Sequence, residues 1–419
     1  MNGHASTVPP RLYSASSVNL EEFKHLCSRT TDPTTYPLCD TISHNVPIYD
    51  IPTLEQTQTP SNNLTALQDE WHHILHSGPG VFVLRKMYDP AKYSSVLSAT
   101  NAAYDSIIAI EKSSAAFSSK GDHFASGGTN DRIWSAFSKH ALTDPESFVS
   151  YYSNPWLAAV STAWLGPGYK ITAQVNAVHP GGAAQSPHRD YHLGFAEEDK
   201  CVHYPMALQL ASQFLTLQGA VAHSDMPVES GPTRYLPFSQ CYAPGYLAWR
   251  RDEFKSFFQE NYISLPLSLG DGVFFNPALF HAAGANVMDP ANGGFRRVAN
   301  LLQISAAMGK TMESVETLPL LESVWELLVS KYKNEAGGVI AGPDMDPVRW
   351  SLPAREVRAL VQAIVEAYPF PTNLDKRPPA PSGMAPESEL DIVVRGLEEG
   401  WGREKVVQEI GQLQRDSRA

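Results

Sequence analysis

Short alternating stretches of hydrophobic and polar residues occupy the middle of the chain, and helical spacing occurs on either side of them. Between residues 170 and 307, stretches rich in apolar and β-branched residues alternate with turns that contain Gly and Pro. Residues 170–178 are the first of these stretches, and residues 295–304 are the last. Such an arrangement is typical of antiparallel sheets. It predicts an α+β protein whose core is a double-stranded β-helix, a jelly-roll or cupin-like sandwich of two sheets.

Helices are expected before and after this core. Residues 64–76 and the segment that begins at Pro90 carry apolar residues at helical spacing. The spacing becomes helical again beyond residue 310, and a Pro-rich linker covers residues 368–386. The last helical segment, residues 387–413, has an apolar stripe that we expect to pack on the body of the protein rather than on a second subunit.

These patterns divide the chain into three regions. Residues 1–60 are rich in Ser, Thr and Pro and show little periodicity, which predicts an extended arm draped on the domain. Residues 61–310 are expected to form the β-helix together with helices that pack on it. Residues 311–419 are expected to form a helical C-terminal extension.

Composition and charge limit the kinds of partner. The chain has 419 residues, of which 43% are hydrophobic, and this is enough for a sizeable core. A net charge of −12 and a pI near 5.6 argue against nucleic acid or an anionic membrane as a partner. The sequence shows neither a stretch of roughly 20 apolar residues nor a secretory leader. We therefore expect a cytoplasmic protein, a monomer or a homodimer, that acts on a small molecule.

The most informative motif is a histidine–x–aspartate pair, His188 and Asp190, which is followed 91 residues later by His281. By chance alone, this composition should contain about one or two such pairs, and the chain has a second one at His223 and Asp225. Context favours the first pair, because it follows a strand and a turn. The second pair lies in a turn-like stretch, and we interpret His223 as a solvated loop histidine.

Two imidazoles and one carboxylate can hold one face of an octahedral Fe(II) and leave the other positions open for a cosubstrate and O2. The predicted strand after His281 carries Arg296 and Arg297, and a guanidinium can grip a carboxylate with two hydrogen bonds. Taken singly, His281 could be a packed core histidine, and the arginines could lie on a solvated strand face. The ordered set predicts an iron and 2-oxoglutarate site, and the carboxylate of Asp190 argues against a halogenase.

These segments carry a family resemblance that spans roughly residues 78–307. The chain resembles the phytanoyl-CoA dioxygenase family of iron/2-oxoglutarate oxygenases, especially its fungal small-molecule members. The matching segments are Gly80–Arg85, Gln185–Asp190, Glu229–Ser239 and His281 through Arg296.

The resemblance implies roles for individual residues. It implies that His188, Asp190 and His281 bind iron, that Arg296 pairs with the far carboxylate of 2-oxoglutarate, and that Gln185 contacts this cosubstrate. Two departures from the family pattern are present. Phe238-Ser239-Gln240 stands where the family usually has Gly-Ser-His, and the loop between His281 and Arg296 is a few residues longer than usual. The longer loop leaves Arg297 as the alternative to Arg296.

The expected function is that of an Fe(II)/2-oxoglutarate-dependent oxygenase, which oxidises an unactivated C–H bond of a small molecule and converts 2-oxoglutarate to succinate. The resemblance places it in fungal secondary metabolism. The same iron chemistry could instead give oxidative cyclisation or desaturation. From a different class, a non-catalytic β-helix binding protein stays open. The sequence contains no nucleophile elbow, phosphate loop or dinucleotide fingerprint that would support a hydrolase or transferase.

One further segment is placed near the site by the pattern. Residues 120–131 are rich in Gly and polar residues, so they are expected to form either a loop over the site or an ordinary connection. Arg132, the next residue, could meet the substrate, but we expect it to form a surface salt bridge.

Overall fold

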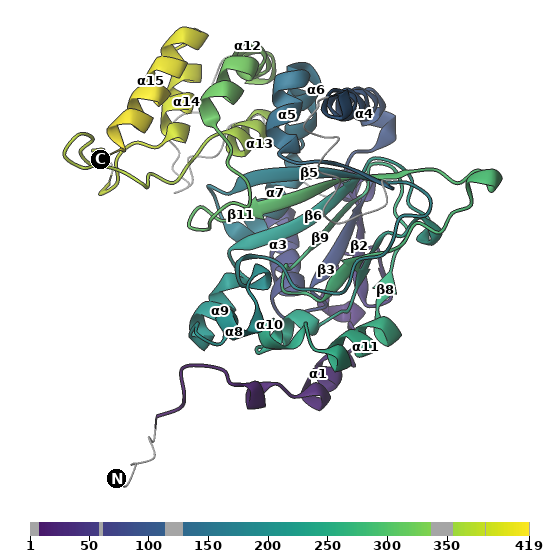
Figure 1. The fold of residues 1–419 in the computed structure, drawn as a ribbon. Helices are drawn as coiled ribbons and strands as arrows, with labels where there is room; N and C mark the ends of the chain where they lie inside the picture. The colour runs from purple at the N-terminus through teal and green to yellow at the C-terminus, as the bar shows by residue number, and fades with distance from the viewer. Residues whose placement is uncertain (1–7, 58–61, 114–128, 337–354, 382, 419) are drawn as a thin grey trace.

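The strands of the protein form two sheets in a computed structural model, which describes residues 8–57, 62–113, 129–336, 355–381 and 383–418 (Figure 1). The large sheet has eight strands, in the order β1 (Thr41–Ser43), β2 (Val46–Asp50), β3 (Val81–Arg85), β9 (Gly272–Phe275), β6 (Thr216–Ala222), β11 (Arg297–Ser305), β5 (Lys170–Val178) and β4 (Asn130–Ile133). The small sheet has three, in the order β10 (His281–Ala283), β7 (Thr233–Tyr235) and β8 (Ile263–Ser264).

The chain alternates between the two sheets as it passes through the core. β5, β6, β9 and β11 belong to the large sheet, and β7, β8 and β10 belong to the small one. After β5 the chain crosses to the small sheet, where His188 forms an antiparallel bridge with His281 of β10. This interleaving joins the two sheets into one jelly roll. It confirms the predicted α+β fold with a double-stranded β-helix.

β11 is an interior strand of the large sheet, between β6 and β5, and its register shows which side chains face inward. It pairs antiparallel with β5 and with β6, so that Leu301 lies opposite Gln174 on one side and Ala220 on the other. Because side chains alternate between faces along a strand, the odd-numbered residues of β11 from Arg297 face the small sheet. The intervening residues, such as Leu302, pack into the helical core.

Helices lie on the outer side of the large sheet, in one layer that contacts its strands and a second layer beyond it (Figure 1). They are α3 (Asn62–His76), α4 (Pro90–Ser113), α5 (Ala136–Thr143), α6 (Pro145–Tyr152), α7 (Pro155–Leu165), α12 (Thr317–Ala336), α13 (Arg355–Ile364), α14 (Glu389–Glu398) and α15 (Arg403–Asp416). The shorter α8 (Glu198–Cys201), α9 (Met206–Ser212), α10 (Gly245–Ala248) and α11 (Asp252–Asn261) lie with α1 (Leu20–Cys27) on the side away from the C-terminal helices (Figure 1). α2 (Ile51–Thr57) comes directly after β2.

Local sequence explains where several of these helices begin. α6 and α7 each start at a proline, and the residue before it, Asp144 or Asn154, accepts a hydrogen bond from a backbone N–H of the first turn. Proline suits the first position because that N–H would have no partner within the helix. α14 begins with a reciprocal capping box between Ser388 and Asp391.

The C-terminal helices join the main core, as the apolar stripe of the last segment indicated. Val393, Leu397 and Trp401 are buried in the same cluster as residues of α3 to α7 and the outer face of the large sheet. The backbone carbonyl of Trp401 also accepts a hydrogen bond from the indole of Trp325 on α12, at 3.0 Å. These helices therefore pack on the sheet-covering layer and do not depend on a second subunit for burial.

The N-terminal region differs from the expected extended arm. β2 pairs in parallel with β3, and β1 pairs with β2 to extend the large sheet at its edge. On α1, Phe23 is buried against Tyr242 and Phe280. These contacts join residues far apart in sequence. The strands and the helix of this region are short, so the local pattern of apolar residues could not indicate that they pack on the core.

His223 is buried rather than solvated, which corrects the interpretation made from its turn-like surroundings. Its ring is within hydrogen-bond distance of the Tyr151 hydroxyl, at 2.9 Å, and the Asn101 side-chain oxygen, at 2.7 Å. A second histidine in the same cluster, His140, is also buried and bonds to the Ser147 hydroxyl at 2.8 Å. Burial lowers the pKa of His223 to about 3 and that of His140 to about 4.

Most of the segment 120–131 lies outside the described residues, so its expected role over the site stays a prediction. Its last two residues begin β4, where Asp131 pairs with Lys112 and His179. Arg132 lines a cavity between the sheets instead of lying at the surface. Within the described part of the chain, no helix combines the length and the apolar character needed to cross a membrane.

The buried histidines predict that the protein loses stability on mild acidification. Both pKa values lie below the unfolded value near 6.5, so the unfolded chain binds more protons and the free energy of unfolding falls as pH drops below about 6.5. Between pH 7 and pH 5, each histidine should contribute a loss of about 2 kcal/mol. Urea unfolding at the two pH values measures it. His223→Gln should reduce the difference in the free energy of unfolding between pH 7 and pH 5. An unchanged difference would contradict the conclusion that His223 is buried in its neutral form.

Candidate active site

Two chain segments meet where the site forms. The backbone N–H of His188 donates to the carbonyl of His281 at 3.0 Å, and the N–H of His281 donates to the carbonyl of His188 at 3.1 Å. The N–H of Asp190 donates to the carbonyl of Pro277 at 2.9 Å. This short antiparallel pairing explains how residues distant in sequence reach one point. It also fixes the backbones that carry the three predicted ligands.

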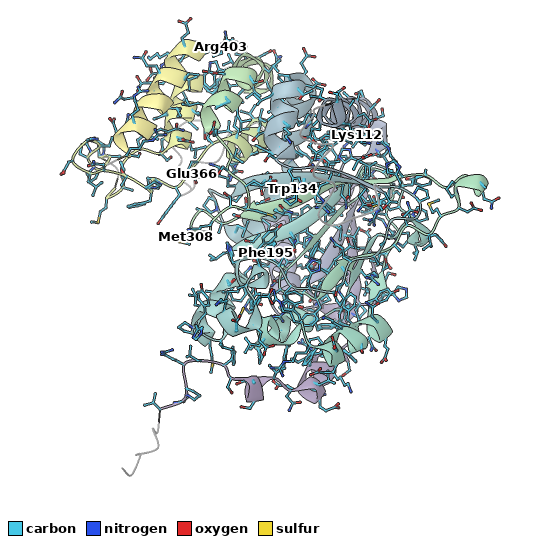
Figure 2. All side chains as sticks on the ribbon, in the orientation of Figure 1. Lys112, Trp134, Phe195, Met308, Glu366 and Arg403 are labelled. Atoms are coloured by element: carbon cyan, nitrogen blue, oxygen red, sulfur yellow. The ribbon has the colours of Figure 1, made fainter. Side chains whose placement is uncertain are left out.

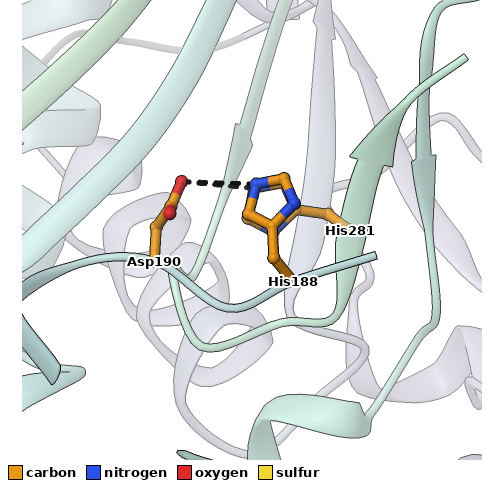
Figure 3. A group of neighbouring side chains, drawn as sticks. All are labelled: His188, Asp190 and His281. Carbon is orange, nitrogen blue, oxygen red and sulfur yellow. Dashed lines mark ion pairs between the residues drawn. The ribbon is translucent and has the colours of Figure 1, made fainter. Parts of the chain in front are cut away.

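The three predicted metal ligands converge (Figure 3). One carboxylate oxygen of Asp190 lies 3.7 Å from Nε2 of His188 and 3.6 Å from Nε2 of His281. One candidate ligand atom from each residue lies within 4.8 Å of the others. These separations suit three ligands that share one ion, so the structure brings together the set predicted from the order of the residues.

Hydrogen bonds orient both imidazole rings. Nδ1 of His188 lies 2.9 Å from the carbonyl of Ser186, and Nδ1 of His281 lies 2.8 Å from the carbonyl of Leu279. A carbonyl only accepts, so each Nδ1 carries the proton and each Nε2 presents its lone pair toward Asp190. This tautomer is the one that binds a metal through Nε2. The sequence could not identify these two acceptors, because they are backbone groups.

The charges of the site favour an ionised carboxylate. Burial acts to raise the pKa of Asp190, but the neighbouring His188 and His281 outweigh it and hold that pKa well below its usual range. Burial also lowers the pKa of His281, and the nearby His188 lowers it further. A carboxylate anion beside two ring nitrogens is the donor set that non-haem Fe(II) oxygenases use, with three positions of the metal left open. The residues therefore fit the predicted iron.

Two residues that support the ligands were not predicted from the sequence. Gln218 on β6 donates from its side-chain nitrogen to the Asp190 carboxylate at 2.8 Å. Arg189 is buried and donates to the carbonyls of Ser239, at 2.6 Å, and Tyr242, at 2.9 Å. Since Arg189 stands between the two ligands of the pair, its anchoring also holds that segment. For Gln218 the available signal was an amide residue inside the otherwise apolar stretch 216–222, whereas Arg189 lies among polar residues and gave no such signal.

The ligands open onto a cavity of about 650 Å³ between the two sheets. One part of its wall is apolar and includes Val83, Leu267, Val273 and Phe275. Another part is polar and contains amide side chains of the large sheet. Gln185 lines the cavity as expected, and its side-chain oxygen accepts a hydrogen bond from the N–H of Ala283 at 3.2 Å.

The two candidate arginines lie in different places. The side chain of Arg296 is 36% exposed and forms an ion pair with Asp105 at 2.5 Å. Arg297 is only 6% exposed and lines the cavity. Burial lowers the pKa of Arg297 to about 10, and no residue in the described part of the chain forms an ion pair with it. The structure thus brings Arg297 to the site and leaves Arg296, the first choice from the sequence, outside it.

The chain is similar in sequence to one protein family and in structure to several solved proteins. A model of the phytanoyl-CoA dioxygenase family (PhyH) matches residues 78–293, just over half of the chain. Among solved structures, the non-heme alpha ketoglutarate dependent epimerase SnoN from nogalamycin biosynthesis is 15% identical, with a TM-score of 0.38 over 58% of this chain and 84% of that one. The carbocyclase SnoK from the same biosynthesis is 17% identical, with a TM-score of 0.40 over 58% and 86%. No curated protein matches the chain.

The ligand geometry predicts that Fe(II) affinity depends on all three side chains. Loss of a side chain that is hydrogen-bonded to a metal-binding residue typically weakens metal binding by roughly 10–100-fold. His281→Ala and Asp190→Asn remove groups that bind the metal directly, so each should weaken Fe(II) binding by more than this. Anaerobic titration calorimetry of the purified protein measures this. His203→Ala serves as the control, because His203 is exposed and outside the cavity lining. Equal affinities for the parent protein and His281→Ala would place the iron elsewhere.

Proposed function

The chain belongs to the phytanoyl-CoA dioxygenase family, and from this premise we propose that it oxidises an unactivated C–H bond of a small molecule in secondary metabolism. The protein is a non-haem iron dioxygenase that uses Fe(II), 2-oxoglutarate and O2. Together these supply an oxidant able to remove hydrogen from such a bond, with release of succinate and CO2. The resemblance of the matching segments to fungal small-molecule members supports the metabolic setting.

One observation carries the proposal: the converging His188, Asp190 and His281 open onto the same cavity as a buried arginine. The three ligands would occupy one face of the iron and leave the opposite face toward the cavity. Their fixed backbones and oriented rings would hold the metal in one place. Part of the cavity wall is apolar, and a bound substrate that displaced water against this wall would strengthen the charge interactions inside.

We assign the far carboxylate of 2-oxoglutarate to Arg297 rather than to Arg296. A buried guanidinium with no anionic partner is costly, and a carboxylate from the cosubstrate would remove that cost. In this proposal Gln185, which lines the same cavity, contacts the cosubstrate as well. Arg296 is already neutralised by Asp105 at the surface.

The product of the reaction depends on the fate of the substrate radical after hydrogen removal. Hydroxylation, desaturation and ring closure share that first step, so the same residues would serve each of them. The role of this chain is to hold the substrate carbon near the iron and to exclude water from it. A screen for succinate release that is stimulated by small metabolites tests the proposal directly. Failure of every class of metabolite to stimulate release would favour a non-catalytic binding protein.

The assignment of Arg297 predicts a difference between two neighbouring arginines. Anaerobic addition of Fe(II) and 2-oxoglutarate should produce a weak visible charge-transfer band, and its dependence on 2-oxoglutarate concentration gives the affinity. Arg297→Ala should weaken that affinity on the order of 10–100-fold, since a charge-assisted pair is lost. Arg296→Ala, the matched control, should leave it within about twofold of the parent protein.

Two results would count against this account. The reverse order of effects would mean that Arg296 reaches the cosubstrate and that the register of β11 differs from the one described. A folded protein that shows no band at all would contradict the iron and 2-oxoglutarate site itself. The band therefore tests the site, and the two arginines test the position of the cosubstrate within it.

A further inference from the structure

Two aromatic side chains of the cavity lining leave much of their ring surface open. Trp134 follows β4, and Phe195 is the last residue of a short 3-10 helix (His192–Phe195). They are 36% and 57% exposed, and both are labelled in Figure 2. Among the large apolar side chains that the described residues leave exposed, these are the two that line the cavity, and we call them the aromatic rim.

The other aromatic residues of the lining differ in accessibility. Tyr235 and Phe275 are buried and pack on each other, with ring centroids 5.1 Å apart, so they offer little surface to a ligand. The aromatic rim is therefore the part of the wall where a ring can be contacted. An exposed aromatic ring at the edge of a pocket presents a flat apolar surface that has few internal degrees of freedom.

A neighbouring side chain packs against each ring of the aromatic rim. The guanidinium of Arg132 lies over the ring of Trp134, 5.7 Å from its centroid, and donates to the side-chain oxygen of Gln174 at 2.9 Å. The ring of Tyr191 lies 5.6 Å from that of Phe195, at an angle of 44°. A side chain that is already supported loses less freedom when a ligand packs on it, so binding costs less.

Aromatic residues connect the rim with two of the three metal ligands. Tyr191, which packs on Phe195, directly follows Asp190 and also lines the cavity. Trp249 is a partly buried residue of the same lining, and its ring centroid lies 6.5 Å from that of His188. A planar molecule on the rim would therefore lie in the same cavity as the ligands, beside the open positions of the iron.

The two arginines nearest these rings have acceptors within the protein. Arg250 lies over the ring of Trp249, 3.8 Å from its centroid, forms an ion pair with Glu197 at 3.1 Å and donates to the carbonyl of Gly194 at 3.2 Å. Arg132 has the amide oxygen of Gln174. Each guanidinium also packs on an indole, where the ring attracts a cation. The ring contacts of a ligand therefore do not depend on its carrying a charge.

We infer that the aromatic rim binds an aromatic ring of the substrate, which lies against Trp134 and Phe195 and brings a nearby carbon toward the iron. The inference rests on the proposed function and narrows its substrate class to small molecules that contain an aromatic ring. An aromatic pair gains about two- to tenfold in affinity beyond what burial of its area provides. An aliphatic ring would gain only from the burial of area.

The test compares matched uncharged probes on the complete Fe(II) and 2-oxoglutarate complex. The two pairs differ only in saturation of the ring: 2-(2-naphthyl)ethanol with 2-(decahydro-2-naphthyl)ethanol, and 3-phenylpropan-1-ol with 3-cyclohexylpropan-1-ol. Anaerobic calorimetry measures binding, and the charge-transfer band shows that the complex has formed. Each aromatic probe should bind about tenfold more tightly than its saturated partner. Burial of apolar area alone predicts no such preference, because the saturated ring is at least as apolar.

Variants that keep an apolar side chain but remove the ring assign the preference to the rim. Phe195→Leu and Trp134→Leu should each reduce the preference for aromatic probes by about threefold. Phe370→Leu is the matched control, because Phe370 is 51% exposed and packs on Tyr368 at 5.4 Å but does not line the cavity. It should keep the full preference. All three side chains are exposed, so the substitutions should leave the protein folded.

The possible results separate this inference from the proposed function. If the band forms but saturated probes bind as tightly as aromatic ones, if no probe binds, or if Phe195→Leu and Trp134→Leu keep the full preference, the rim does not bind a ring of the substrate. If the band itself fails to form in folded protein, the iron and 2-oxoglutarate site is refuted first. A preference that shrinks in the two rim variants and persists in Phe370→Leu supports the inference.

Discussion

The site depends on a short backbone pairing between two segments that are far apart in sequence. The two backbone hydrogen bonds between His188 and His281 set the distance between the rings. The backbone hydrogen bond from Asp190 to Pro277 fixes the position of the third ligand. Three side chains can bind one ion tightly only when their backbones are already held, since otherwise binding must order them. The alternation of the chain between two sheets brings those segments together.

Burial of charge is the main cost of this arrangement, and the protein offsets it differently at each residue. Asp190 is surrounded by two imidazoles and the amide of Gln218. Among the residues that the structure describes, Arg189 has no acidic partner, but it donates to two carbonyls and lies close to the rings of Tyr246 and Phe280. A Cβ at Gly245 would come within 1.9 Å of the Arg189 guanidinium, so glycine is required there.

Arg297 is the buried charge that the described residues leave without an ion pair. A cation buried in this way has a high affinity for a carboxylate, because the anion restores the interactions that burial removed.

The sequence predicted the features that depend on order and periodicity. The strands, the double-stranded β-helix and the three ligands could be inferred from alternation, turns and the spacing of His188, Asp190 and His281. Arg296 was preferred over Arg297 because its Gly-Phe-Arg context matches the family pattern. A loop of unusual length before it leaves the register of the strand open, and a shift of one residue in a strand moves a side chain to the other face. His223 was judged from its local turn residues, although Tyr151 and Asn101, distant in sequence, bury it. The edge strands β1 and β2 and the role of Gln218 also depend on long-range contacts.

The central claim is that one iron ion joins these two segments and that 2-oxoglutarate extends from it toward Arg297. The most direct measurement is a crystal structure grown anaerobically with Fe(II) and 2-oxoglutarate, with diffraction recorded on both sides of the iron absorption edge. The account predicts a single anomalous peak bound by His188, Asp190 and His281, with the far carboxylate of 2-oxoglutarate against Arg297. Iron bound by other residues, or a cosubstrate carboxylate that points away from Arg297, would contradict it.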